Sequence, residues 1–161
     1  MKKLGMLLCD LHGRENALAR DLLRISAHHA ADHEVYHLAR DLAVWSQDHV
    51  AALADAAPRY GLDLDPEPDA DASLTRRVRE RAGDLLGRQS EAALLLLHDL
   101  RKVYVDASGV SLDWEIAGQV AQATKDGDLL ALVGRCHPDT LRQVRWANAK
   151  IKETSPQTFT S

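Results

Sequence analysis

Apolar residues recur at alternating steps of four and three along the first segment of the chain, which places them on one face of an α-helix. Glu15 lies in the middle of this face. A carboxylate buried there is costly unless it is paired, protonated or bound to a metal. The pattern predicts a first helix over residues 3–28. The apolar residues of its buried face are Leu4, Leu8, Leu11, Leu18, Leu22 and Ile25.

The same rhythm resumes after a predicted tight corner at residues 30–32, where Asp32 is well placed to cap a second helix. The polar member of the second apolar face is His49, again in mid-helix. Pro58 and Gly61 are expected to end this helix. We therefore expect His49 to face Glu15 across the core. The remaining members of the face are Val35, Leu38, Leu42, Trp45, Leu53 and Ala56.

Residues 62–72 contain two prolines and five acidic residues, which predicts a solvated connector long enough for a crossover. A third helix is expected over residues 73–105, with Ser73 as its cap and a stop at residues 106–109. A shorter helix follows at residues 111–124. The last helical region runs from residue 129 to residue 153, with a kink or a new first turn at Pro138.

These elements predict an all-α fold, an antiparallel four-helix bundle with a short extra helix before a kinked last helix. The length of 161 residues suits one domain, which we place at residues 1–155, with a polar tail at residues 156–161. Only 4% of the residues are aromatic, and this composition favours helix over sheet.

The formal charge of −4 gives no general attraction to nucleic acid or to an anionic membrane, and neither is expected as a partner. The longest fully apolar run outside the amino terminus covers residues 92–97, far short of a membrane span. Cys9 and Cys136 read as free thiols, because the chain shows no secretory signal. We expect a soluble, cytoplasmic protein.

The run Asp10-Leu11-His12 with Glu15 and Leu18 resembles the ferritin-like superfamily, in particular its small bacterial members. The resemblance implies a bundle whose centre holds two iron or manganese ions. It also implies that each metal-bearing pair of helices supplies a lone Glu and a Glu-x-x-His, and Glu15 matches the lone Glu.

The second and last helices depart from this pattern. Ser46 stands three residues before His49, where the resemblance requires Glu, and the last helix has Thr140, Gln143 and Asn148 where carboxylates are needed. A complete di-iron site is therefore not expected.

Several polar side chains are nevertheless candidate metal ligands. The first choice is Glu15 and His49, completed by Glu91 and His137, with Gln89 and Asp99 as further possibilities. The second choice is Glu34 and His37, which form a true Glu-x-x-His near the start of the second helix. His29, His33 and His37 are spaced by four, but we expect the corner to separate His29 from the other two. For Cys136-His137 we favour a structural bend over a reactive pair, because adjacent helical residues point about 100° apart.

Two main functions follow. The first is a non-catalytic structural or stress-associated protein without a resident cofactor, forming a homodimer through residues 94–97 and its tryptophan-bearing faces. The alternative is an iron- or manganese-binding ferritin-like protein, or an oxidoreductase, that uses a partial site around Glu15 and His49. A helical interaction module for another protein is the third possibility.

Overall fold

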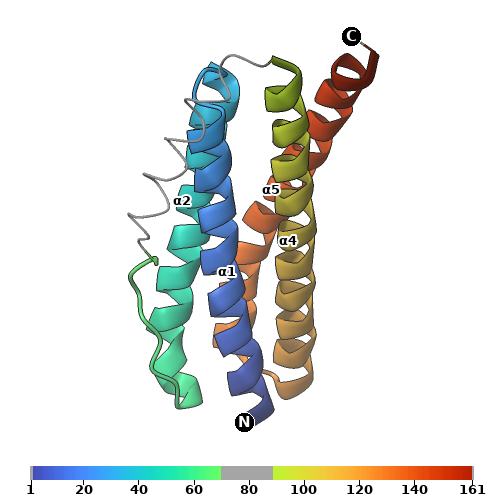
Figure 1. The fold of residues 1–161 in the computed structure, drawn as a ribbon. Helices are drawn as coiled ribbons and strands as arrows, with labels where there is room; N and C mark the ends of the chain where they lie inside the picture. The colour runs from blue at the N-terminus through green and yellow to red at the C-terminus, as the bar shows by residue number, and fades with distance from the viewer. Residues whose placement is uncertain (1, 70–88, 161) are drawn as a thin grey trace.

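The computed structural model describes residues 2–69 and 89–160, and within these ranges it is all-helical with no strand. In these described ranges four long helices form a bundle, and a short 3-10 helix follows the second of them (Figure 1). The elements are α1 (Lys2–His28), α2 (His33–Ala56), η1 (Ala57–Tyr60), α4 (Gln89–Thr124) and α5 (Gly127–Thr160). In this described part, no helix combines the length and apolar character needed to cross a membrane.

The helices lie side by side along most of their length (Figure 1). In that view α1 rises from the lower end, α2 returns to it, α4 descends from the upper end and α5 rises again. The closest packing is between α4 and α5 and between α1 and α2, and α1 also packs on α4. By contrast, α2 and α5 contact each other little, so α1 and α4 form the main link between the two helix pairs.

The predicted apolar face of α1 is buried in the core. Leu11, Leu18, Leu22 and Ile25 are completely inaccessible to solvent, and Leu8 is nearly so. Each fully buried aliphatic side chain stabilises the fold by about 1.5–3 kcal/mol relative to exposure. The helical spacing in the sequence thus identified the residues that hold α1 in the bundle.

Both predicted ends of α2 are confirmed. The side chain of Asp32 accepts a hydrogen bond of 3.1 Å from the backbone N–H of Val35, which satisfies an otherwise unpaired donor of the first turn. At the other end, Pro58 lies in η1 and Gly61 adopts a left-handed conformation with φ 72°. These local signals fix the corner between α1 and α2 and the exit from α2.

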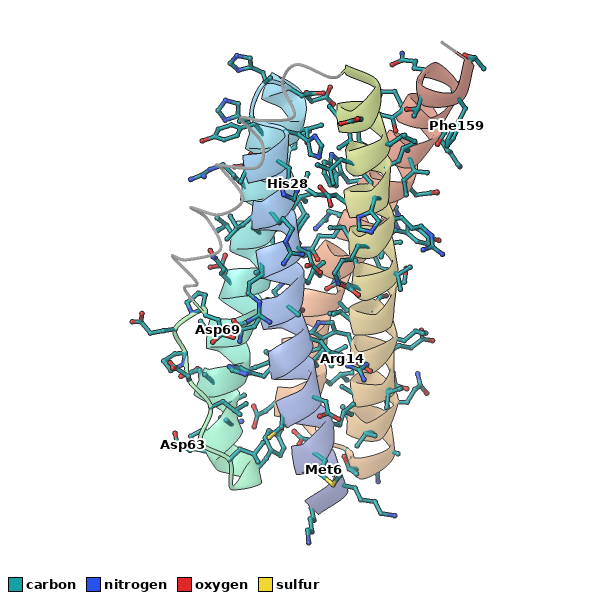
Figure 2. All side chains as sticks on the ribbon, in the orientation of Figure 1. Met6, Arg14, His28, Asp63, Asp69 and Phe159 are labelled. Carbon is teal, nitrogen blue, oxygen red and sulfur yellow. The ribbon has the colours of Figure 1, made fainter. Side chains whose placement is uncertain are left out.

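The connector after Gly61 is attached to α1 as far as residue 69, while most of its described residues are exposed, as expected. The backbone carbonyl of Asp65 lies 2.8 Å from Nε2 of His12, and the backbone N–H of Asp69 donates to Oδ1 of Asn16 at 3.1 Å. Arg20 forms an ion pair with the Asp69 carboxylate at 2.7 Å. Figure 2 shows Asp63 and Asp69 along this stretch. One face of α1 makes all these contacts, because His12, Asn16 and Arg20 are spaced by four residues.

The stop predicted at residues 106–109 is wrong, because α4 continues through it without a break. Asp106 accepts a hydrogen bond from Lys102 one turn earlier at 2.8 Å, and Gly109 has no left-handed φ. Ala107 and Val110 are buried in the core. Their burial holds the segment in helical geometry, and residues 111–124 are therefore part of α4 rather than a separate helix.

The new helical turn predicted at Pro138 is also wrong, since α5 includes Pro138 and Pro156 in its interior. A kink of the axis at Pro138 stays a prediction. Most of the segment assigned to a polar tail is helical, because α5 ends only at Thr160.

Two predictions concern residues 73–88, which lie outside the described residues: the Ser73 cap and the first part of the third helix. Within the described part, the leucine run at residues 94–97, which is expected to contribute to a dimer contact, is partly exposed. Leu94 is half exposed, while Leu96 packs partly on the core.

Candidate functional site

Glu15 of α1 is the meeting point of three helices. Its side chain is fully buried, and its Oε1 atom accepts hydrogen bonds from Nδ1 of His49 in α2 at 2.9 Å and from Nε1 of Trp114 in α4 at 2.8 Å. The His49 and Trp114 rings also meet edge to face, with centroids 6.1 Å apart. The predicted contact between Glu15 and His49 is therefore present, and Trp114 joins it.

The second ring nitrogen of His49 faces another carboxylate. Its Nε2 atom lies 3.3 Å from Oδ2 of Asp139 in α5, and the other oxygen of Asp139 accepts from Arg142 at 2.7 Å. A polar chain of Glu15, His49, Asp139 and Arg142 thus runs from the core to the exposed side of α5. All four helices contribute to this centre, because Trp114 belongs to α4.

The two carboxylates favour the charged form of His49. Burial alone would lower the pKa of His49, but the hydrogen bond and the negative charge of Glu15, with smaller effects from Asp139, raise it above its ordinary value of 6.5. The centre is therefore arranged to hold an imidazolium between two carboxylates.

We expect the stabilising effect of His49 to depend on pH. Because its pKa is raised in the folded state, its contribution is fully present below the unfolded-state pKa and is lost as the pH rises through the folded-state pKa. Urea unfolding of the parent and of His49→Gln should show a gap in free energy of unfolding that narrows as the pH rises above about 6.5. His33→Gln, at an exposed position, is the control, and a gap for His49→Gln that widens with pH would contradict this assignment.

Neutral side chains occupy the neighbouring positions where a two-metal centre would need carboxylates. Nε2 of Gln143 donates to Oγ of Ser46 and to the backbone carbonyl of Leu42, both at 2.8 Å. The hydroxyl of Thr140 donates to the carbonyl of Cys136 in its own helix. Ser46, Thr140 and Gln143 are completely buried, so they fill this part of the core with neutral groups.

Cys136 and His137 do not act as a pair. Cys136 is completely buried, and burial raises the pKa of its thiol to about 12, so the nucleophilic thiolate is strongly disfavoured. The His137 ring lies 2.9 Å from the hydroxyl of Ser111 in α4. This geometry agrees with the expectation that the two residues do not cooperate. It does not agree with a new helical turn at Pro138, because α5 is continuous there.

The proposed additional ligands do not join Glu15 and His49. Glu91 is exposed in the first turn of α4, and about 35 Å of helix separates it from Trp114, the α4 residue that contacts Glu15. The hydrogen bond of His137 is to Ser111 rather than to either residue of the pair. The structure therefore does not join either residue to the pair, because residues on one helix face at the right spacing can still lie at different levels of the bundle. Their assignment as metal ligands stays a prediction.

The second-choice pair lies on the surface. Glu34 is exposed and forms an ion pair with Lys150 of α5 at 2.9 Å. His37 is exposed and stacks on His33, with ring centroids 6.0 Å apart. As expected, His29 is separated from these two: it is buried and faces Asp99 of α4 instead.

The sequence reasoning missed the roles of three residues. Neither the contact of Trp114 with Glu15 nor that of Asp139 with His49 was predicted. Asp99 was named only as a further possible ligand for the site of Glu15 and His49. What Asp99 meets depends on how α4 lies against the end of α1.

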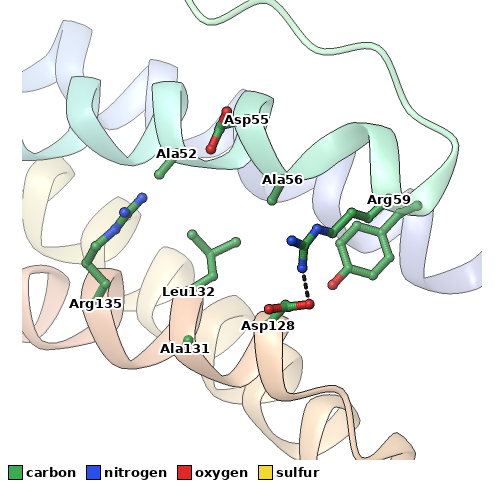
Figure 3. Close-up of a pocket in the computed structure, with 9 residues that line it drawn as sticks. Ala52, Asp55, Ala56, Arg59, Asp128, Ala131, Leu132 and Arg135 are labelled. Atoms are coloured by element: carbon green, nitrogen blue, oxygen red, sulfur yellow. Dashed lines mark ion pairs between the residues drawn. The ribbon is translucent and has the colours of Figure 1, made fainter.

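A separate open cavity of about 340 Å³ lies between α2 and α5 (Figure 3). Its lining carries two basic and two acidic side chains, and Arg59 and Asp128 form an ion pair across it. This balance gives no preference for a ligand of either charge. The lining residues are Ala52, Asp55, Ala56, Arg59, Tyr60, Asp128, Ala131, Leu132 and Arg135.

Comparison with protein-family models finds no match for the chain, and comparisons with curated proteins and with solved structures find none either.

Proposed function

We propose that this protein is an antiparallel, ferritin-like four-helix bundle without a di-metal centre, which serves a non-catalytic structural or stress-associated role. The chain directions visible in Figure 1 support the arrangement, because the helices that contact each other run in opposite directions. The end of α2 and the start of α4 lie at opposite ends of the bundle, as in bundles with one long crossover.

The observation that carries the proposal is that both ring nitrogens of His49 are engaged by carboxylates, Nδ1 by Glu15 and Nε2 by Asp139. A histidine binds a metal through an unprotonated ring nitrogen, and an imidazolium has none. The raised pKa of His49 favours that imidazolium. Together with the neutral Ser46 and Gln143, this leaves too few free ligands for two divalent ions.

One observation favours the alternative, an iron- or manganese-binding site around Glu15 and His49. Oε2 of Glu15 is buried and has no hydrogen-bond partner among the described residues, and the same holds for Oε1 of Gln143. A buried acceptor without a donor is costly, and a bound cation or an ordered water would satisfy it. The alternative therefore predicts a single ion beside Glu15.

Metal analysis of the purified protein separates the two functions. We expect iron plus manganese well below one ion per chain, and the same low content in Glu15→Gln, because the charged centre needs no metal. The parent and the variant should be purified in parallel and compared by elemental analysis. One or two iron or manganese ions per chain, lost in Glu15→Gln, would favour the alternative and overturn the proposal.

We also propose a homodimer in the cytoplasm. The outward side of α4 supports self-association, because Leu94, Val105, Leu112 and Ile116 are at least half exposed. A monomer mass by light scattering at micromolar concentration would contradict the dimer.

A further inference from the structure

A second polar cluster lies at the end of the bundle where α1 meets α4. Figure 2 shows His28 near this upper end. Nδ1 of His28 lies 2.8 Å from Oδ2 of Asp99, and Nε2 of His29 lies 3.1 Å from the same oxygen. His29 and Asp99 are buried, and His28 is only slightly exposed. Two imidazoles from the α1–α2 corner thus converge on one carboxylate oxygen of α4.

The spacing of these atoms suits a metal ion. The three ligand atoms all lie within 4.8 Å of one another, and in the part of the chain that the structure describes no other three metal-ligating side chains are so arranged. Zinc ligands lie about 2.0–2.2 Å from the ion, so neighbouring ligands in a tetrahedral or octahedral shell are about 3 Å apart. The separations of the two imidazole nitrogens from Asp99 have this length, and the two nitrogens lie within 4.8 Å of each other.

The charge of the cluster also favours a cation. His28 is the last residue of α1, at the end where the helix dipole is negative. Oδ2 of Asp99 lies within hydrogen-bonding distance of both His28 and His29, and its Oδ1 atom lies 3.5 Å from Nδ1 of the exposed His98.

We propose that His28, His29 and Asp99 bind one zinc ion through Nδ1, Nε2 and Oδ2, respectively. Two imidazoles and one carboxylate form a ligand set that zinc accepts, and three protein ligands leave a position for water. The ion links the end of α1 to α4, two elements far apart in sequence. This site is separate from the Glu15–His49 centre and does not depend on the function proposed above.

Zinc titration of the metal-stripped full-length protein tests the site. Isothermal titration with zinc chloride should give one ion per chain, and zinc should raise the Tm increasingly as its free concentration rises. Loss of a residue that only supports a metal ligand weakens binding by about 10–100-fold. Asp99→Asn and His29→Gln should each weaken zinc binding by more than this. His28→Gln, at the most exposed ligand, provides a further test if a buried variant loses its helix content by circular dichroism.

Two control variants distinguish this site from the other candidates. His37→Gln removes a histidine from the exposed His33–His37 pair near the start of α2, and Glu15→Gln alters the bundle centre. Both should bind zinc as the parent does. Absence of zinc binding by the parent would overturn the proposal, as would binding that survives Asp99→Asn and His29→Gln but is lost in His37→Gln. Binding lost only in Glu15→Gln would overturn both this site and the proposed metal-free centre.

Discussion

Replacement of Glu15 by alanine is expected to lower the free energy of unfolding by about 3–5 kcal/mol, the usual result of removing one partner from a buried ion pair. The substitution removes the main charge that keeps the proton on the buried His49 ring, and it removes the acceptor of the Trp114 N–H. For a domain of this size the loss corresponds to a fall in Tm of about 6–20 °C. Urea unfolding followed by circular dichroism measures it.

Arg14→Ala is the matched control, because Arg14 precedes Glu15 and forms an ion pair of 2.7 Å with Asp113, the neighbour of Trp114. Arg14 is 57% exposed, so removal of this pair between the same two helices should cost at most about 1 kcal/mol. Equal losses for Glu15→Ala and Arg14→Ala would show that the buried pair contributes no more than a surface pair.

Replacement of Trp114 by alanine is the second large effect, with an expected loss of about 3–5 kcal/mol. Trp114 is among the largest fully buried side chains of the described residues, and it links α4 to Glu15 of α1. Trp114→Phe keeps much of the ring volume but removes the donor. It should cost about 1.5–3 kcal/mol, the range for a hydrogen bond to a charged group.

Trp146→Phe supplies the comparison for the loss of an indole N–H. Nε1 of Trp146 is buried without a hydrogen-bond partner among the described residues, so its removal should change the free energy of unfolding by less than Trp114→Phe does. Circular dichroism is the suitable probe, because either substitution alters tryptophan fluorescence. If the two variants lose equal stability, the bond from Trp114 to Glu15 contributes nothing beyond packing.

The sequence by itself was sufficient for α1, α2 and their contact. The helical period placed Leu11, Leu22 and Glu15 on one face, and Asp32 marked the start of the next helix. Glu15 and His49 are each the polar member in the middle of an apolar face, and this shared feature paired the two residues. Each of these inferences depends on local geometry, which the order of residues along a short stretch determines.

Only the tertiary structure decided what α4 and α5 bring to α1 and α2. Asp106 and Gly109 are local signals for a helix end, but burial of Val110 on the same helix stabilises a continuous α4 more than those signals oppose it. The connection between α2 and α4 is long, so it does not determine the position of α4 along α1. Packing of the helix faces determines that position. The contacts of Trp114 and Asp99 depend on that position. The sequence therefore predicted the contact of Glu15 with His49, whereas only the tertiary structure shows its contact with Trp114.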